Sequence, residues 1–394
     1  MTHNEVVILG GARTPFTRLL GSLASLTAVD LGSAAVTGAL RSSGIEPTDV
    51  DHVILGQVLQ AGAGQNPARQ SAIEAGIGWD VPTLTLNKVC LSGLVAITDA
   101  ARLIRSGEAS VVVAGGQESM TNAPHVLPGA RKGFKYGETA LLDVAAHDGL
   151  TDAFDRVSMG LSTERHNAPL GISRESQDAL AAASHVRAAA ATADGVFDSE
   201  IVSVDVPGRK GSVTVVDADE GIRADSTPES LSRLRPAFDP EGTITAGNSS
   251  PLSDGAAAVV VADRAWADER GLEWLAVVRS PGQVAGPDTS LHSQPSRAIE
   301  HALGREGWGV GDLDLVEINE AFAAVGIQSM RDLNLSDDIV NIHGGAIAIG
   351  HPIGASGARL ALHAALELSR RGSGKAAVSL CGGGGQGEAL LLER

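Results

Sequence analysis

The strongest constraint on the fold is a regular alternation of short β-branched segments with segments that carry helix-end residues. Asn66-Pro67 and Gly76, for example, supply a cap, a first-turn proline and a terminal glycine. Such alternation predicts parallel strands covered by helices, an α/β fold. In the first part of the chain the predicted strands are 6–9, 52–55, 83–87 and 110–114, and the predicted helices are 30–44, capped by Asp30, 66–76 and 92–105.

The same alternation returns after residue 254, so two similar halves are predicted. Between them lies a stretch rich in Gly, Pro, His and Asp, with an Ala-rich helix at 174–191 and β-like pieces at 201–206 and 213–216. We therefore predict duplicated βαβαβ halves, 1–119 (completed by about 253–274) and 275–394, with 120–252 as an inserted loop domain. The later predicted elements are strands 254–261, 275–279, 315–318, 339–342 and 376–380, and helices at 296–303, through Phe322 and from Ser356.

Charge and cysteine content exclude several classes of protein. With 47 acidic and 30 basic side chains, the net charge of −17 leaves no broad basic face for nucleic acid or an anionic membrane. Two cysteines far apart in sequence make neither a disulfide framework nor a Cys-rich zinc site, so no metal is expected. Because the first residues do not resemble a secretion signal, we expect reduced thiols and a cytoplasmic location.

The first cysteine lies at a position suited to a nucleophile. Cys90, in Asn87-Lys-Val-Cys-Leu-Ser-Gly93, falls between a predicted strand and a predicted helix. Free N–H groups and the helix dipole favour a thiolate at such a point. A buried cysteine that acts as a small apolar side chain is an equally good interpretation of this position alone.

A histidine in a glycine-rich loop favours the catalytic interpretation. His351 lies in Gly350-His-Pro-Ile-Gly-Ala-Ser-Gly357, where glycines let the backbone approach closely and an imidazole can be aimed. A lone histidine is more commonly structural, but a cysteine with a histidine is the pair that activates a thiol nucleophile. His343 lacks such a setting.

The second cysteine precedes glycines whose spacing, at 382, 384 and 387, matches a dinucleotide-binding fingerprint. That fingerprint needs a following helix, whereas a strand is predicted at 388–392. We instead expect the glycines to expose backbone N–H groups beside the Cys381 thiol, as an oxyanion hole requires.

Two further motifs follow predicted strands. Asn319-Glu-Ala-Phe322 stands where a strand ends and a helix starts, which suits either a catalytic amide or a simple helix cap. Arg13, after the first strand, is predicted to be structural, with its guanidinium paired inside the protein.

Together these motifs resemble those of the thiolase family. Cys90 within N-x-x-C-x-S-G, Asn319-Glu-Ala-Phe322, Gly350-His-Pro-Ile-Gly354 and Cys381-x-Gly-Gly-Gly-x-Gly387 occur in family order. The resemblance extends from Ala12 to the final strand and is greatest to bacterial acetyl-CoA acetyltransferases. It implies five layers, α-β-α-β-α, built from the two halves.

The resemblance implies a reversible, ping-pong Claisen condensation of two acetyl-CoA molecules to acetoacetyl-CoA and CoA. Cys90, made more nucleophilic by His351, would attack the thioester and become acylated. Cys381 would deprotonate the second acetyl-CoA, or protonate the departing enolate in thiolysis. His351 and a water held by Asn319 would stabilise the enolate oxygen, and the N–H groups of Cys90 and Gly383 the tetrahedral intermediate.

By the same resemblance, the inserted segment would bind CoA. Arg223 would lie near the adenine, Ser230 and Ser250 near the pantetheine, and Leu150 and Met159 in the wall. CoA and acyl-CoA would be substrates, and no other cofactor is expected.

Several pocket positions depart from the common family pattern. Ser158 stands where many members have histidine, Pro251 where they have glycine, and Ala285, before a long loop at 286–294, where a pocket methionine is common. Phe322, which helps to close short-chain pockets, is retained. Acetyl and acetoacetyl substrates are therefore expected.

Three alternatives remain open at this point. A broader-chain 3-ketoacyl-CoA thiolase of fatty-acid β-oxidation would use the same machinery. A decarboxylating ketosynthase would share the fold but have a Cys-His-His site, and the cysteine at position 381 argues against it. A non-catalytic acyl-CoA- or lipid-binding relative would be expected to lose the cysteines, and this sequence keeps both. The segment Thr121–Asp143 resembles the family's tetramerisation loop, so a homotetramer is favoured over a dimer.

Overall fold

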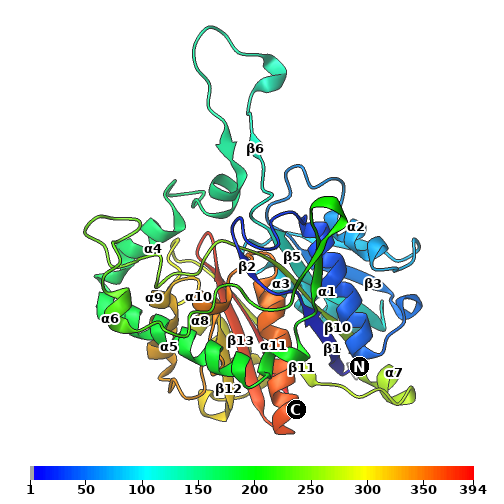
Figure 1. Ribbon diagram of the computed structural model, residues 1–394. Coiled ribbons are helices and arrows are strands. Elements are labelled where there is room, and N and C mark those ends of the chain that lie inside the picture. Colours follow the sequence, from blue (N-terminus) through cyan, green and yellow to red (C-terminus); the bar gives the residue numbers. More distant parts are fainter. Residues whose placement is uncertain (1–3) are drawn as a thin grey trace.

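The computed structural model describes residues 4–394, whose main sheet contains ten strands (Figure 1). The sheet order is β4-β3-β5-β10-β1 in the first half and β11-β14-β13-β12 in the second, with β1 and β11 paired at the junction. β2 (Thr17–Arg18) pairs with β10. The strands are β1 (Val6–Arg13), β3 (His52–Gly56), β4 (Thr83–Leu86), β5 (Val111–Ser119), β10 (Ser253–Asp263), β11 (Ala276–Ala285), β12 (Leu315–Ile318), β13 (Lys375–Gly382) and β14 (Gln386–Glu393).

The predicted duplication is visible in the strand order, which is mirrored about the junction. The prediction of a strand at 339–342 is wrong. Val340 makes only a single parallel bridge, to Val316 of β12. In the first half, the strand β4 occupies the corresponding position beside β3. Asn341 has a φ of 45°, and its side chain takes over the pairing. Its Oδ1 accepts from the N–H of Ile318 at 2.9 Å and its Nδ2 donates to the carbonyl of Ile318 at 2.8 Å.

The prediction of a parallel sheet holds only at its two ends. Among the described strands, parallel pairing joins β3 to β4 and β5, and β12 to β13. The central strands β5, β10, β1, β11, β14 and β13 pair antiparallel. The tight turn between β13 and β14 leaves no room for the crossover helix that a parallel pair needs.

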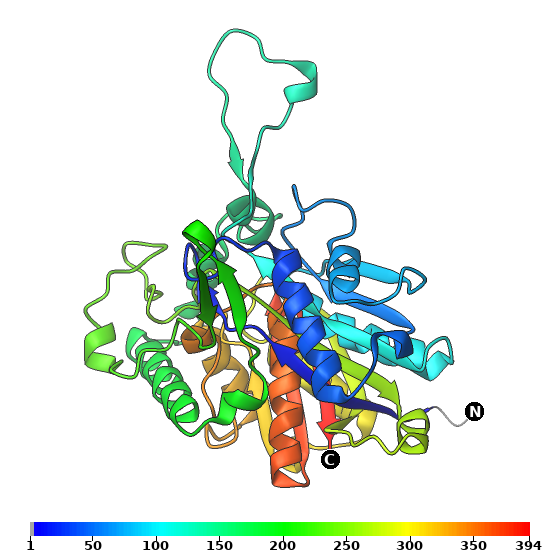
Figure 2. The ribbon, with the colours of Figure 1, turned by 45° about the vertical axis from the view of Figure 1, so that its right-hand side comes forward.

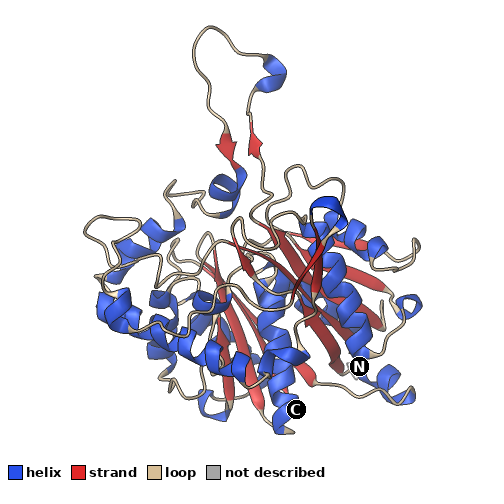
Figure 3. Cartoon of the chain, in the orientation of Figure 1, coloured by secondary structure: helices blue, strands red, loops and turns tan. Residues whose placement is uncertain are grey.

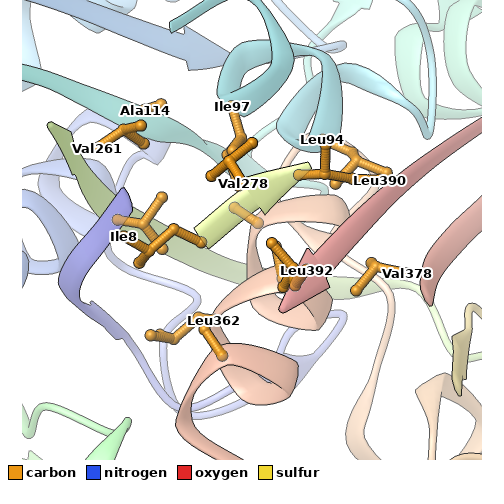
Figure 4. Packing of buried hydrophobic residues seen from close by; sticks show 14 of the residues in the cluster. Ile8, Leu94, Ile97, Ala114, Val261, Val278, Leu362, Val378, Leu390 and Leu392 are labelled. Atoms are coloured by element: carbon orange, nitrogen blue, oxygen red, sulfur yellow. The ribbon is translucent and has the colours of Figure 1, made fainter. Parts of the chain in front are cut away.

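Helices form three layers about the two halves of the sheet, which confirms the α-β-α-β-α arrangement. In the middle, α3 (Ser92–Ser106) and α11 (Ser356–Arg371) pack against each other and against both halves of the sheet (Figures 3 and 4). Leu94 and Ile97 of α3 and Leu362 of α11 enter this core. The outer layers are α1 (Ala28–Ser43) and α2 (Pro67–Glu74) on the first half and α8 (Gln294–Glu306) and α9 (Ala323–Leu333) on the second.

Three helix starts differ from the predictions, and that of α8 lies at Gln294 instead of residue 296. α1 is capped by Thr27, and Asp30 is its partner in a capping box, because the Asp30 carboxylate accepts from the N–H of Thr27 at 2.7 Å. α9 begins at Ala323, since Phe322 before it has extended backbone. The remaining helices of the α/β halves are the short α7 (Arg264–Glu269) and α10 (Ala346–Ile349).

The segment between β5 and β10 consists of helices, two two-stranded sheets and loops. It carries a projecting loop, which spans 121–143 and includes β6 (His125–Val126) and β7 (Leu142–Asp143) (Figure 2). None of the helices in residues 4–394 is long and apolar enough to cross a membrane. The other elements of the segment are α4 (Met159–Asn167), α5 (Arg174–Ala193), β8 (Val204–Pro207), β9 (Val213–Val216) and α6 (Pro228–Leu231).

Arg13, at the end of β1, is paired inside the protein as predicted. Its fully buried guanidinium lies 2.7 Å from a carboxylate oxygen of Glu200 and makes two hydrogen bonds, of 2.7 and 2.8 Å, to Asp219. The other oxygen of Glu200 lies 2.8 Å from Nδ1 of His363 on α11. This network ties β1, the inserted segment and the central helix layer together.

Candidate active site

A cavity of about 380 Å³ collects most of the predicted site residues. Cys90 comes to its wall from the first half, whereas His351 and Cys381 come from the second. The wall also contains Leu150, Met159, Ser250, Phe322 and Gly383. A mainly apolar pocket with a few polar groups at one place is the usual form of a small-molecule site.

Cys90 follows a strained turn that leads into α3. The preceding residue, Val89, has a φ of 53°, which a β-branched side chain rarely adopts. Side chains on either side stabilise this conformation. Asn87 Oδ1 accepts from the N–H of Val89 at 2.9 Å, and Ser92 Oγ accepts from the N–H of Lys88 at 2.8 Å and donates to the carbonyl of Val89 at 2.6 Å.

Burial dominates the acidity of both thiols. It raises the pKa of Cys90 to about 11, although the N–H groups of Gly383 and of Cys90 itself, which point at the thiol, oppose the rise. Burial and the neighbouring Cys90 likewise raise the pKa of Cys381. The sequence led us to expect that the helix start favours a thiolate at Cys90, whereas burial outweighs these N–H groups and raises the pKa.

His351 is held by α11 in one tautomer. Ser356 Oγ donates to the carbonyl of Pro352 at 2.9 Å, so its oxygen accepts from Nδ1–H of His351 at 2.6 Å. This arrangement leaves Nε2 of His351 unprotonated, 3.4 Å from Nδ2 of Asn319. Burial, with the charge of Arg359, lowers the pKa of His351 to about 3, so the imidazole is neutral near pH 7.

Asn319 lies behind the cavity wall, at the end of β12. Its side chain is buried, and within residues 4–394 its Oδ1 has no hydrogen-bond partner. A buried carbonyl oxygen in this state is suited to accept from a water molecule. The observation agrees with an amide that holds a water beside His351.

Cys381 and Gly383 come from the β13–β14 hairpin. Cys381 is paired with Gly387 at the end of β13, and Gly383 begins the turn. Each half thus supplies one thiol, but at different places, after β4 in the first half and at the end of β13 in the second. The residue that corresponds to Cys90, ahead of the central helix of its half, is His351.

The predicted CoA residues do not all reach the cavity. Ser250 lines it, and its hydroxyl donates to the carbonyl of Ala321 at 3.0 Å. Arg223 and Ser230 are exposed and lie outside the wall. Ser230 forms a capping box with Thr227 at the start of α6.

Sequence reasoning missed several apolar residues of the wall, among them Leu291 and Phe238. Leu291, in the loop after β11, is 3% exposed and lines the cavity, whereas Ala285, predicted at the place of the pocket methionine, does not. Phe238 packs edge-to-face on Phe322, with ring centroids 6.1 Å apart. Leu291 is the one large apolar side chain between 286 and 293, a signal that could have identified it.

A metal centre is not suggested by the described part of the chain, where no three His, Cys, Asp or Glu side chains are grouped as ligands. The titratable side chains in the cavity wall are two thiols, Cys90 and Cys381, and the imidazole of His351.

Known proteins of one family match nearly the whole chain. Family models for the thiolase N-terminal and C-terminal domains match residues 6–265 and 272–394. A "Probable acetyl-CoA acetyltransferase" of Mycolicibacterium smegmatis is 56% identical, covering 98% of this chain and 100% of its own, and an "Acetyl-CoA acetyltransferase" of Chromobacterium violaceum is 48% identical over 99% and 100%. The crystal structure of the Bacillus anthracis acetyl-CoA acetyltransferase, 38% identical, covers 99% of both chains with a TM-score of 0.96. The chain belongs to the thiolase family.

Proposed function

We propose that this protein is an acetyl-CoA C-acetyltransferase, which condenses two acetyl-CoA molecules reversibly to acetoacetyl-CoA and CoA. The observation that carries the proposal is one cavity whose wall contains two thiols, from different halves, and a neutral histidine. The names of the full-length relatives support the same activity.

In the first half-reaction, Cys90 attacks the acetyl thioester and CoA leaves as a thiol. Nε2 of His351 accepts the proton of Cys90 and returns it to the sulfur of CoA. Because the pKa of the thiol is raised to about 11 and that of the imidazole is lowered to about 3, a thiolate–imidazolium pair is unfavourable before substrate binds. Proton transfer therefore accompanies the attack. The N–H groups of Cys90 and Gly383 stabilise the tetrahedral oxyanion.

In the second half-reaction, Cys381 passes its thiol proton to Nε2 of His351 and removes a proton from the methyl group of a second acetyl-CoA. The enolate oxygen accepts hydrogen bonds from His351, now protonated at Nε2, and from a water held by Asn319. The carbanion attacks the acetyl group on Cys90, the S–C bond to Cys90 breaks, the Cys90 sulfur takes the proton from Nε2 of His351, and acetoacetyl-CoA leaves. Thiolysis is the same path in reverse.

The cavity wall supports a short acyl group. Leu291, Met159 and Phe322 belong to one buried cluster that includes Cys381, so a chain attached at the reacting carbon meets them at once. A broader-chain 3-ketoacyl-CoA thiolase, the second candidate, needs this wall to open. The retained cysteines argue against a non-catalytic relative.

Mass spectrometry of the intact protein after incubation with acetyl-CoA tests the proposal. We expect one acetyl group on Cys90, absent from Cys90→Ala. Cys381→Ala should still be acetylated but should not form acetoacetyl-CoA. Wild-type protein that stays unmodified, or is modified elsewhere, would refute the mechanism.

We propose that residues 120–252 bind CoA, with Ser230 and Ser250 near the pantetheine, Leu150 and Met159 in the wall and Arg223 near the adenine. Leu150, Met159 and Ser250 in the wall support this assignment, and the exposure of Arg223 and Ser230 leaves both side chains free to contact CoA. CoA binding by single-site variants of Arg223 and Ser230, measured by calorimetry, would test it.

We also propose a homo-oligomer, with a tetramer favoured. Two exposed features support it. The edge strand β4 offers unpaired backbone groups, with Leu84 46% exposed, and the projecting loop carries Phe134 and Tyr136 at its exposed end.

A further inference from the structure

The oxyanion hole is divided between the two halves of the fold. One donor, the N–H of Cys90, belongs to the turn before α3, and the other, the N–H of Gly383, belongs to the β13–β14 turn. Two N–H groups stabilise one oxygen only while both turns keep a fixed relative position, and a shift of about 1 Å is enough to cost much of the rate. Something must therefore hold the two turns together.

Packing brings the turns into contact but does not orient them. A Cβ built on Gly383 would lie 3.4 Å from Cγ1 of Val89, and one built on Gly382 would lie 2.7 Å from Cγ of Leu91. These side-chain contacts are apolar and can slide; a polar contact between the turns is the N–H of Gly383, which points at the Cys90 thiol. The strained backbone of Val89 adds to the need for a directional restraint, because its relaxation would turn the N–H of Cys90 away.

One ion pair crosses between the two turns. Nζ of Lys88, two residues before Cys90, lies 2.8 Å from Oε2 of Glu388, which follows the Gly387 that pairs with Cys381. The Glu388 side chain is fully buried and that of Lys88 is 26% exposed, so the pair is largely shielded from water. Gln283 of β11 also donates to Glu388, at 2.9 and 3.1 Å to its two oxygens, and fixes the carboxylate.

The geometry points to the Lys88–Glu388 pair as a positioning device for the oxyanion hole. Neither residue lines the cavity that contains the two thiols and His351. Lys88 anchors the turn of Cys90 to β14, and Glu388 anchors the hairpin of Cys381 and Gly383 to that turn. The pair acts on the rate of acyl transfer to Cys90 and not on CoA affinity. This inference rests on the proposed function.

The test is the rate constant for acetylation of Cys90, measured by rapid quenching and intact-protein mass at increasing acetyl-CoA. We expect Lys88→Gln and Glu388→Gln each to lower the saturating rate constant by about 10- to 100-fold. The acetyl-CoA concentration at half-saturation should stay unchanged. The double variant should be no slower than the slower single variant, and Lys88→Arg should recover most of the rate.

A matched control lies at the other end of the same strand. Glu393 of β14 pairs with Arg279 at 2.6 Å, away from the cavity, so Glu393→Gln should acetylate at the wild-type rate. If Glu388→Gln does not fold, wild type, Lys88→Gln and Lys88→Arg still decide the question.

Wild-type acetylation combined with an undiminished rate in Lys88→Gln would overturn this inference alone. A raised half-saturating concentration at an unchanged rate constant would overturn it as well, since the pair would then serve binding. A wild-type protein that is not acetylated would overturn the proposed function and the inference with it.

Discussion

Truncation of Leu291 to alanine should open the acyl pocket. Leu291 is 3% exposed and belongs to the cluster of Met159, Phe322 and Cys381. The substitution removes three carbons from the wall. A 3-ketohexanoyl chain is two methylenes longer than acetoacetyl and would fill that space, gaining about 1.6 kcal/mol at ~0.8 kcal/mol per buried methylene, or roughly 15-fold in selectivity.

The assay compares kcat/KM for thiolysis of 3-ketohexanoyl-CoA and acetoacetyl-CoA. The ratio should rise about 15-fold in Leu291→Ala, while the protein loses about 2–5 kcal/mol of unfolding free energy. Leu303→Ala is the matched control, because Leu303 of α8 is equally buried but lies in the core of the second half. It should lose similar stability at an unchanged ratio. An unchanged ratio in Leu291→Ala would refute the assignment of this residue to the acyl pocket.

Three other perturbations have defined outcomes. Ser356→Ala should lower kcat by roughly 10- to 100-fold at a similar KM, because a buried Nδ1–H of His351 left without its acceptor costs about 1–3 kcal/mol; steady-state kinetics will show it. Burial would raise the pKa of Glu200, but the neighbouring imidazole and guanidinium lower it to about 2. Its stabilisation is therefore complete above the unfolded pKa of about 4.3 and is lost as pH falls toward 2, so urea unfolding of Glu200→Gln should lack that part of the acid dependence. Replacing Phe134 and Tyr136 by serine should shift the mass in light scattering from tetramer to dimer without loss of Cys90 acetylation.

Helices and strands were predicted well where the residues that determine them lie within the element or at its ends. The glycine at 44 ends α1 in the left-handed conformation, and α3 begins at Ser92 as its apolar stripe indicated. The prediction failed where pairing is set at long range. Asn341 replaces a strand by side-chain hydrogen bonds to Ile318, and nothing within 339–342 distinguishes this from a ladder.

The sequence also identified part of the candidate site. Its two cysteines and His351 lie in motifs that are typical of catalytic residues, and the structure brings these three residues to one cavity. The acidity of Cys90 could not be predicted from its helix position, because desolvation depends on segments hundreds of residues away. Leu291 was missed because it lies in a loop without a regular repeat, so the sequence does not indicate which side chains of the loop point into the cavity.

The place of β14 in the sheet has a consequence for synthesis. It follows every other strand in sequence, yet it lies inside the sheet between β13 and β11. Until these residues emerge from the ribosome, the nascent chain exposes two facing strand edges with a gap between them. The same strand closes the hairpin that carries Cys381 and Gly383, so this hairpin and the continuous sheet are completed together. Catalytic competence and protection from edge-to-edge aggregation should therefore arise in a single late step.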